Sequence, residues 1–135
     1  MIATDIRRQV ILLAAGRCKY YRMDQSLQGA TFHVEHIIAK QHVDDDVDDP
    51  NALALACNRC NAYKGTNLSS IDPETKDTVL LYNPRQDRWQ DHFMLRDGEI
   101  VGLTAAGRAT VRLLHMNAPQ RLELRLQWLE DGGEL

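Results

Sequence analysis

The sequence predicts an α+β fold in one domain, and three observations support this prediction. Residues 4–15 repeat apolar positions at helical spacing, whereas residues 31–38 and several segments within 79–103 are short and rich in β-branched and aromatic side chains. Residues 104–129 return to helical spacing. A chain of 135 residues has the size of one ordinary domain, so we expect a single domain over residues 1–135.

The first helix is expected over residues 4–15. Thr4 can cap its start and Gly16 can end it. Three apolar residues recur at i, i+4 and i+7 and define its buried face: Ile6, Val10 and Leu13. We therefore expect an amphipathic helix, followed by a turn-rich segment that contains Cys18.

A strand, a second strand and a helix are expected next. Residues 31–38 alternate apolar and polar side chains, which predicts a strand. An acidic loop over residues 39–49 leads to a turn at Pro50 and a short apolar strand before Cys57. A helix is then expected to start near Asn58.

The C-terminal extension, residues 66–135, is expected to form a small sheet and then two helices. Residues 69–77 contain Asp72-Pro73 and few apolar side chains, which predicts a connection. The predicted elements are strands over 79–82, 89–95 and 100–103, with turns at 83–84 and 97–98, and helices over 104–116 and 119–129. Thr104 is a candidate cap, and the alternation of Leu122, Leu124 and Leu126 leaves a strand as the alternative for the last element.

Composition narrows the class of protein without naming a function. No apolar run approaches the roughly 20 residues that cross a bilayer, and the first residues lack a secretory signal, so we expect a cytoplasmic protein without a membrane partner. The three cysteines include Cys57-x-x-Cys60, which favours metal-bound thiolates over a disulfide framework.

The formal net charge of −3 is unfavourable for contact with phosphates. Five acidic residues, however, lie in one six-residue loop: Asp44, Asp45, Asp46, Asp48 and Asp49. Without these five the balance would be +2, so a basic face elsewhere is compatible with the sequence. Arg108, Arg112, Arg121 and Arg125 form either such a basic stripe or an ordinary solvated helix surface.

Residues 18–65 contain the most informative pattern in the chain: His33-Val34-Glu35-His36, then Asn51, then Cys57-Asn58-Arg59-Cys60-Asn61, then Lys64-Gly65. Phosphodiester hydrolysis needs a base for water, a positive charge near the phosphate and help for the leaving oxygen. His36 can act as the general base near neutral pH. The pattern therefore predicts metal-assisted cutting of nucleic acid.

The neighbouring polar groups can complete such a site. Glu35 and Asn61 offer hard oxygen ligands, which suit Mg²⁺ or Mn²⁺, and Asn51 can orient the ring of His36. Lys64 is expected to contact a phosphate oxygen. His33 can contact the metal, a phosphate or Glu35, or it can make a structural hydrogen bond.

This segment resembles the HNH endonuclease family, in the variant whose last histidine is an asparagine. The resemblance implies a ββα-metal core over residues 18–65 with flanking helices, and DNA phosphodiesters as the substrate. It also implies His36 as general base, Asn51 as the residue that holds it, and Glu35 with Asn61 as ligands of one catalytic divalent cation.

The chain departs from the family pattern at its cysteines. Family members with this knuckle usually carry an earlier C-x-x-C that completes a four-cysteine zinc site, but here Cys18 is followed by Tyr21. Structural zinc is almost always four-coordinate, so Cys18, Cys57 and Cys60 can hold Zn²⁺ only if another group completes the site.

Two other hypotheses compete with the nuclease hypothesis. The first is a non-catalytic, zinc-supported module of the same fold that binds nucleic acid or a protein. The second is a zinc-binding interaction domain whose motif matches are accidental. Neither the strandedness of the substrate nor the oligomeric state follows from the sequence.

Overall fold

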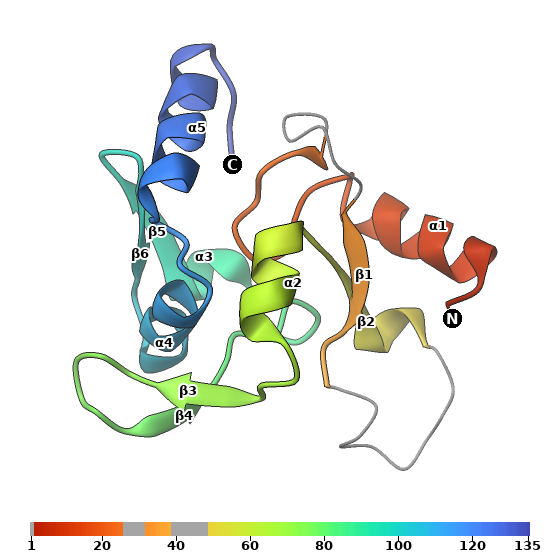
Figure 1. The fold of residues 1–135 in the computed structure, drawn as a ribbon, viewed down its shortest axis with the longest axis horizontal. Coiled ribbons are helices and arrows are strands. Elements are labelled where there is room, and N and C mark those ends of the chain that lie inside the picture. The colour runs from red at the N-terminus through yellow and green to blue at the C-terminus, as the bar shows by residue number, and fades with distance from the viewer. Residues whose placement is uncertain (1, 26–31, 39–48) are drawn as a thin grey trace. The chain divides into compact units, whose positions relative to one another are not determined.

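The computed structural model describes residues 2–25, 32–38 and 49–135 (Figure 1). Over these described residues it confirms an α+β fold, built from short helices and three two-stranded antiparallel sheets. His42 and most of the acidic loop lie outside the described residues. Among the helices that the structure describes, none has the length and hydrophobicity needed to cross a bilayer.

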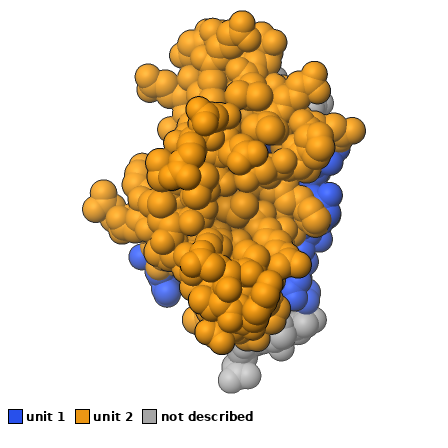
Figure 2. Space-filling model, turned by 90° about the vertical axis from the view of Figure 1, so that its left-hand side faces the viewer, with its two compact units in different colours: residues 1–68, 83–86 blue, residues 69–82, 87–135 orange. Residues whose placement is uncertain are grey.

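The chain divides into two compact units (Figure 2). The first comprises residues 1–68 together with 83–86, and the second comprises residues 69–82 together with 87–135. The continuous part of the first unit ends close to the end expected for the motif core. The single-domain organisation over residues 1–135 stays a prediction.

The first unit begins with helix α1, Thr4–Leu13, as expected. Its start differs from the prediction, because the cap residue is Ala3 and no side chain caps the helix. Val10 is fully buried, but Leu13 is 51% exposed, so the apolar face is narrower than its spacing indicated. The chain leaves the helix through positive φ angles, which include 70° at Gly16.

The expected strand, strand and helix follow. Strand β1 is His33–His36, strand β2 is Leu53–Ala56, and helix α2 is Asn58–Lys64. A 3₁₀ turn, η3, covers Pro50–Ala52. Helices α1 and α2 both contact the β1–β2 ribbon and lie on opposite sides of it (Figure 1).

The second unit contains two hairpins that the sequence predicted only in part. Residues 69–77 are not a plain connection, because β3, Ser69–Ile71, pairs with β4, Thr78–Leu80. Trp89–His92 forms the short helix α3, not a strand, and the chain then continues into β5, Phe93–Arg96.

The second hairpin closes as expected. Strand β5 pairs with β6, Glu99–Gly102, through a turn at Asp97-Gly98 whose φ angles are 52° and 83°. Both angles are positive, as a type I′ hairpin turn requires. The prediction of a turn at this dipeptide is therefore confirmed.

Two helices complete the second unit. Helix α4, Ala105–Leu113, is capped by the Thr104 hydroxyl, which accepts a hydrogen bond from the Gly107 amide at 3.0 Å. Helix α5, Pro119–Glu130, is helical throughout, so the strand alternative is wrong.

Each unit has its own buried side chains. In the first unit these include Val10, Tyr20, Met23, Phe32, Leu53 and Leu55, and in the second they include Tyr82, Trp89, Phe93, Ile100, Leu114 and Met116. Separate cores are what compact units of this size need for stability.

Candidate active site and thiolate cluster

The predicted site residues lie on the β1–β2 ribbon and helix α2. The two strands are antiparallel, with Glu35 opposite Ala54 and His36 opposite Leu53. Directly opposed residues share a face of the ribbon, and neighbours along a strand point to opposite faces. Glu35 therefore lies on the face that carries the small side chain of Ala54, and His36 lies on the face of Leu53.

Glu35 is held inside the first unit. Only 6% of the residue is exposed. Its Oε1 accepts a hydrogen bond from the hydroxyl of buried Tyr20, and its Oε2 lies 3.5 Å from Nζ of Lys64. Burial raises the pKa of the Glu35 carboxyl to about 7, while Lys64 and Tyr20 oppose that shift.

Lys64 is a structural neighbour of this carboxylate. It is 2% exposed, and its ammonium group donates to the Ile37 carbonyl at 2.9 Å. The ammonium thus joins helix α2 to the end of β1. The expected contact with a substrate phosphate would need a cation that is more accessible than this one.

The Tyr20 hydroxyl acts as a hydrogen-bond donor to Glu35. The pKa of Tyr20 is held well above its ordinary value, first by burial and then by the Glu35 charge. The hydroxyl therefore keeps its proton at neutral pH and donates to Glu35. No sequence motif marked Tyr20; its position two residues after Cys18 was the only available signal.

His36 ends β1, and the chain bends at Ile37 and Ile38 directly afterwards. His36 is half-buried and His33 is exposed. Asn51 is exposed in η3, where its backbone amide donates a hydrogen bond to Asp49 Oδ1 at 2.9 Å. The orienting role of Asn51 and the substrate contact of His33 stay predictions.

Asn61 lies in the first turns of α2, on the helix that supplies Lys64. Its backbone is part of the helix, since its amide donates to Cys57 O at 2.9 Å. Among the described residues its side-chain carboxamide makes no hydrogen bond, so the side-chain oxygen is available to coordinate a metal ion. A shared ion between Glu35 and Asn61 stays a prediction.

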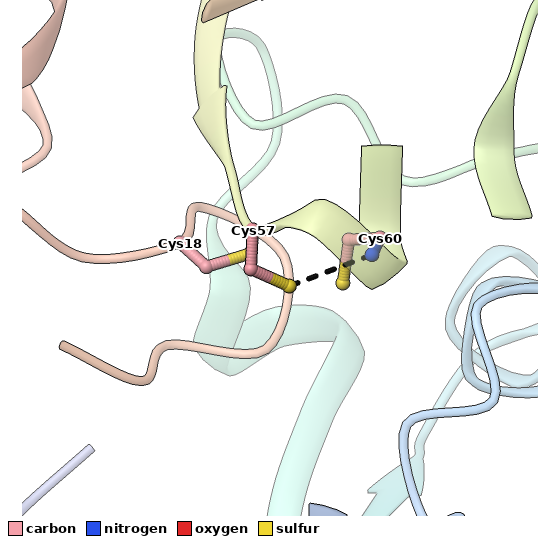
Figure 3. A group of neighbouring side chains, drawn as sticks. All are labelled: Cys18, Cys57 and Cys60. Carbon is pink, nitrogen blue, oxygen red and sulfur yellow. Dashed lines mark hydrogen bonds between the residues drawn. The ribbon is translucent and has the colours of Figure 1, made fainter. Parts of the chain in front are cut away.

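Three cysteines meet at the start of α2 (Figure 3). Cys18 comes from the loop after α1, Cys57 is the cap residue between β2 and α2, and Cys60 comes from the helix itself. Their sulfur atoms all lie within 4.8 Å of one another, and all three residues are buried. Cys57 also caps the helix, because its Sγ accepts a hydrogen bond from the Cys60 amide at 3.4 Å.

These thiols fit a soft metal ion such as zinc. A tetrahedral zinc with Zn–S bonds of about 2.3 Å holds its sulfurs roughly 3.8 Å apart, so a small contraction of the cluster would suffice. Burial raises the pKa of the Cys18 thiol to about 11, which disfavours the thiolate unless a cation stabilises it. The cluster can thus bind a metal through three sulfurs.

Comparison with known proteins identifies the segment that contains these elements. Residues 17–67 match the HNH endonuclease family. This HNH segment includes β1, β2, α2 and all three cysteines. The family resemblance seen in the motif is therefore confirmed over this part of the chain, and a nuclease type of function is supported in general terms.

A curated relative extends the similarity beyond the HNH segment. The Septu protein PtuB of Bacillus thuringiensis is 26% identical over 117 residues, which cover 87% of this chain and 43% of the relative. The chain thus spans less than half of that relative's length. No solved structure gives a significant match to the chain.

The basic stripe considered for the C-terminal helices does not exist. Arg121 and Arg125 are 3% and 0% exposed, and Arg108 pairs with Asp72 through two hydrogen bonds of 2.9 and 2.8 Å. The solvated-surface alternative is equally wrong for the two buried arginines. Their guanidinium groups bind main-chain carbonyls near the end of α4, including Leu114 O at 2.7 Å.

Proposed function

We propose that this chain is an HNH-type endonuclease that hydrolyses DNA phosphodiester bonds with one divalent cation, Mg²⁺ or Mn²⁺, and a histidine base. One observation supports this most strongly. The HNH segment keeps Glu35-His36 on a strand and Asn61 on the helix packed against it, in the order of the family motif.

His36 is the proposed general base. A neutral imidazole takes a proton from the attacking water and so makes it nucleophilic. Its place at the end of β1, where the chain bends, favours access from solvent more than a position in mid-strand would. Asn51 is proposed to orient the ring, and His33 to contact a substrate phosphate.

Glu35 and Asn61 are the proposed ligands of the catalytic cation. A carboxylate has about four acceptor sites, so its contacts with Tyr20 and Lys64 leave capacity for an ion. When bound, the cation would stabilise the charge that develops on the phosphate. We assign Lys64 and Tyr20 to holding the Glu35 carboxylate rather than to substrate binding.

The three cysteines are proposed to hold a structural Zn²⁺. They tie the loop after α1 to the start of α2, so an ion there would stabilise the frame that carries Asn61. In the family pattern a cysteine at position 21 would supply the fourth ligand. This chain has Tyr21 there and so lacks that thiolate.

A non-catalytic binding module of the same fold is the second candidate. One observation favours it: Glu35 is buried and already contacts an ammonium group and a hydroxyl. Such a module would bind nucleic acid or a protein without cutting, and its binding would not depend on Mg²⁺.

The decisive experiment is a cleavage assay of the full chain on plasmid, single-stranded DNA, duplex DNA and RNA, with Mg²⁺, Mn²⁺, Zn²⁺ or EDTA. We expect cleavage of DNA that needs Mg²⁺ or Mn²⁺. His36→Ala should lower kcat by roughly 10²–10⁴-fold, the usual contribution of general base catalysis.

The matched control is His115→Asn, which removes an exposed histidine of the second unit. Asparagine suits that site because His115 has a φ of 49°. Equal cleavage by His36→Ala and the parent would rule out this base. Tight binding without cleavage under every metal condition would favour the binding module.

A further inference from the structure

Arg85 is brought to the first unit by a short turn that the proposed mechanism does not use. Residues 83–86 belong to the first unit although the chain on both sides of them belongs to the second. The Asn83 carboxamide fixes the turn, because its Oδ1 accepts from the Arg85 amide at 2.9 Å. The Arg85 guanidinium then donates from Nε to Leu53 O at 2.8 Å.

Lys19 reaches the same edge of β2. Its backbone amide donates to Leu55 O at 2.9 Å. The Ala52 carbonyl points toward β1, because it accepts a hydrogen bond from the Ile37 backbone amide. Successive carbonyls along a strand point in opposite directions. The carbonyls of Leu53 and Leu55 therefore point away from β1. Lys19 and Arg85 thus attach to the outer edge about 7 Å apart, since a strand rises about 3.3 Å per residue.

The two cations at this edge have no carboxylate partner among the described residues. Within that part of the chain no ion pair is formed by Lys19 or Arg85, and both residues are half-buried. Two cations attached to one edge without a compensating carboxylate among the residues described suit a polyanion.

We propose that Lys19 and Arg85, here called the β2-edge cluster, bind the phosphate backbone of the nucleic acid that the HNH segment cuts. The inference rests on the proposed function for the identity of the anion. It also answers the objection raised by the net charge of −3, because phosphate contacts depend on a local group of cations.

The position of the cluster agrees with this role. Leu53 accepts from Arg85 and lies opposite His36 in the ribbon. Neighbouring strands lie about 4.8 Å apart, so the cluster is on the order of 10 Å from the His36 backbone. At about 3.4 Å of axial rise per nucleotide, this distance corresponds to a phosphate at most about three steps from the one that is cut.

The test compares Lys19→Gln and Arg85→Gln with the control Arg112→Gln. Each change removes one positive charge, and Arg112 is an exposed arginine of the second unit. Binding of a short fluorescent DNA duplex by the full chain in EDTA is measured across a tenfold range of NaCl concentration. Loss of one phosphate contact lowers the slope of log Kobs against log[salt] by about 0.9.

We expect that reduction in slope for Lys19→Gln and Arg85→Gln, and no reduction for Arg112→Gln. A slope change of about 0.9 corresponds to a factor of roughly eight in affinity for each tenfold change in salt concentration. In about 0.1 M salt, one decade below 1 M, the affinity should therefore fall up to roughly eightfold for each lost contact. In the cleavage assay KM should rise while kcat stays constant. Lys19→Gln keeps the backbone bond to Leu55, so it tests the charge even if Arg85→Gln lowers stability.

Equal slopes for all three variants and the parent would overturn the proposal, even if the parent cuts DNA. If the parent binds DNA through the β2-edge cluster but never cuts, the cluster stands and the nuclease assignment fails. The two conclusions are therefore separable in one set of proteins.

Discussion

At the scale of single residues, Tyr20 joins the two candidate sites. It lies two residues after Cys18, and its hydroxyl donates to Glu35. A group that holds a ligand in place usually changes metal affinity when it is removed, by about 10–100-fold in known sites. Removal of the hydroxyl should thus affect binding of the ion that Glu35 is proposed to hold more than it affects the fold.

Tyr20→Phe removes this hydroxyl and keeps the ring. We expect weaker Mn²⁺ binding by roughly 10-fold or more, measured by the free Mn²⁺ signal in electron paramagnetic resonance. Tyr82→Phe is the matched control, because Tyr82 is also buried but belongs to the second unit. Unchanged Mn²⁺ affinity in Tyr20→Phe would contradict the positioning role.

Lys64→Met tests whether the buried ammonium is structural. Removing one member of a buried ion pair leaves the other uncompensated and typically costs about 3 kcal/mol or more. Because the pKa of Glu35 is raised to about 7, protonation can relieve part of that cost, so we expect about 1–3 kcal/mol at neutral pH. Chemical denaturation measures this loss. A stability equal to the parent's, together with weaker DNA binding, would restore the phosphate role.

At the scale of elements, the β3–β4 hairpin is attached to α4 by one buried carboxylate. Asp72 is fully buried and accepts two hydrogen bonds from Arg108, which lies in α4. Asp72 also accepts from the Glu74 amide at 3.0 Å and from the Thr75 hydroxyl at 3.0 Å. Together these contacts hold the pKa of the Asp72 carboxyl well below its usual range.

Asp72→Asn should therefore lower the melting temperature of the second unit in a way that depends on pH. A carboxyl whose pKa is lower when folded stabilises the fold above its unfolded pKa, near 4, and loses that contribution as pH falls toward the folded pKa. Thermal unfolding at pH 7 and at about pH 3 should show a large difference between parent and variant at neutral pH and a smaller one in acid. A constant difference would contradict the charge-based role.

The same hairpin shows where sequence reasoning stops. The core of the motif was predictable, because His33–His36, Leu53–Ala56 and the start of α2 follow periodicity and spacing. Residues 69–77 resembled a connection because they contain few apolar side chains, and the contact that orders them reaches 36 residues along the chain. Local pattern carries no signal for such a partner.

The burial of Arg121 and Arg125 has the same kind of cause. Their helical spacing was visible, but the carbonyls that they bind belong to the end of α4, the turn beyond it and the β5–β6 turn. Charged residues are usually exposed, so composition alone predicts the surface. The β2-edge cluster was missed for a related reason, since Lys19 and Arg85 meet only through β2.

At the scale of the whole molecule, the chain holds two cores, and the thiolate cluster belongs to only one of them. A structural metal contributes its binding free energy to the unit that forms its site. The second unit instead relies on its own apolar side chains, such as Phe93 and Ile100, and on the Asp72–Arg108 pair. Loss of metal should therefore affect the two units unequally.

Zinc removal measures this difference. We expect purified chain to release about one Zn²⁺ to a strong chelator, and hydrogen exchange to accelerate in β2 and α2 while β5, β6 and α4 stay protected. Cys60→Ser should reproduce the effect without chelator, because Cys60 supplies one of the three sulfurs. Equal acceleration in both units would mean that the chain unfolds as one cooperative body. Unchanged exchange everywhere, with no zinc released, would leave the three thiols as buried apolar groups.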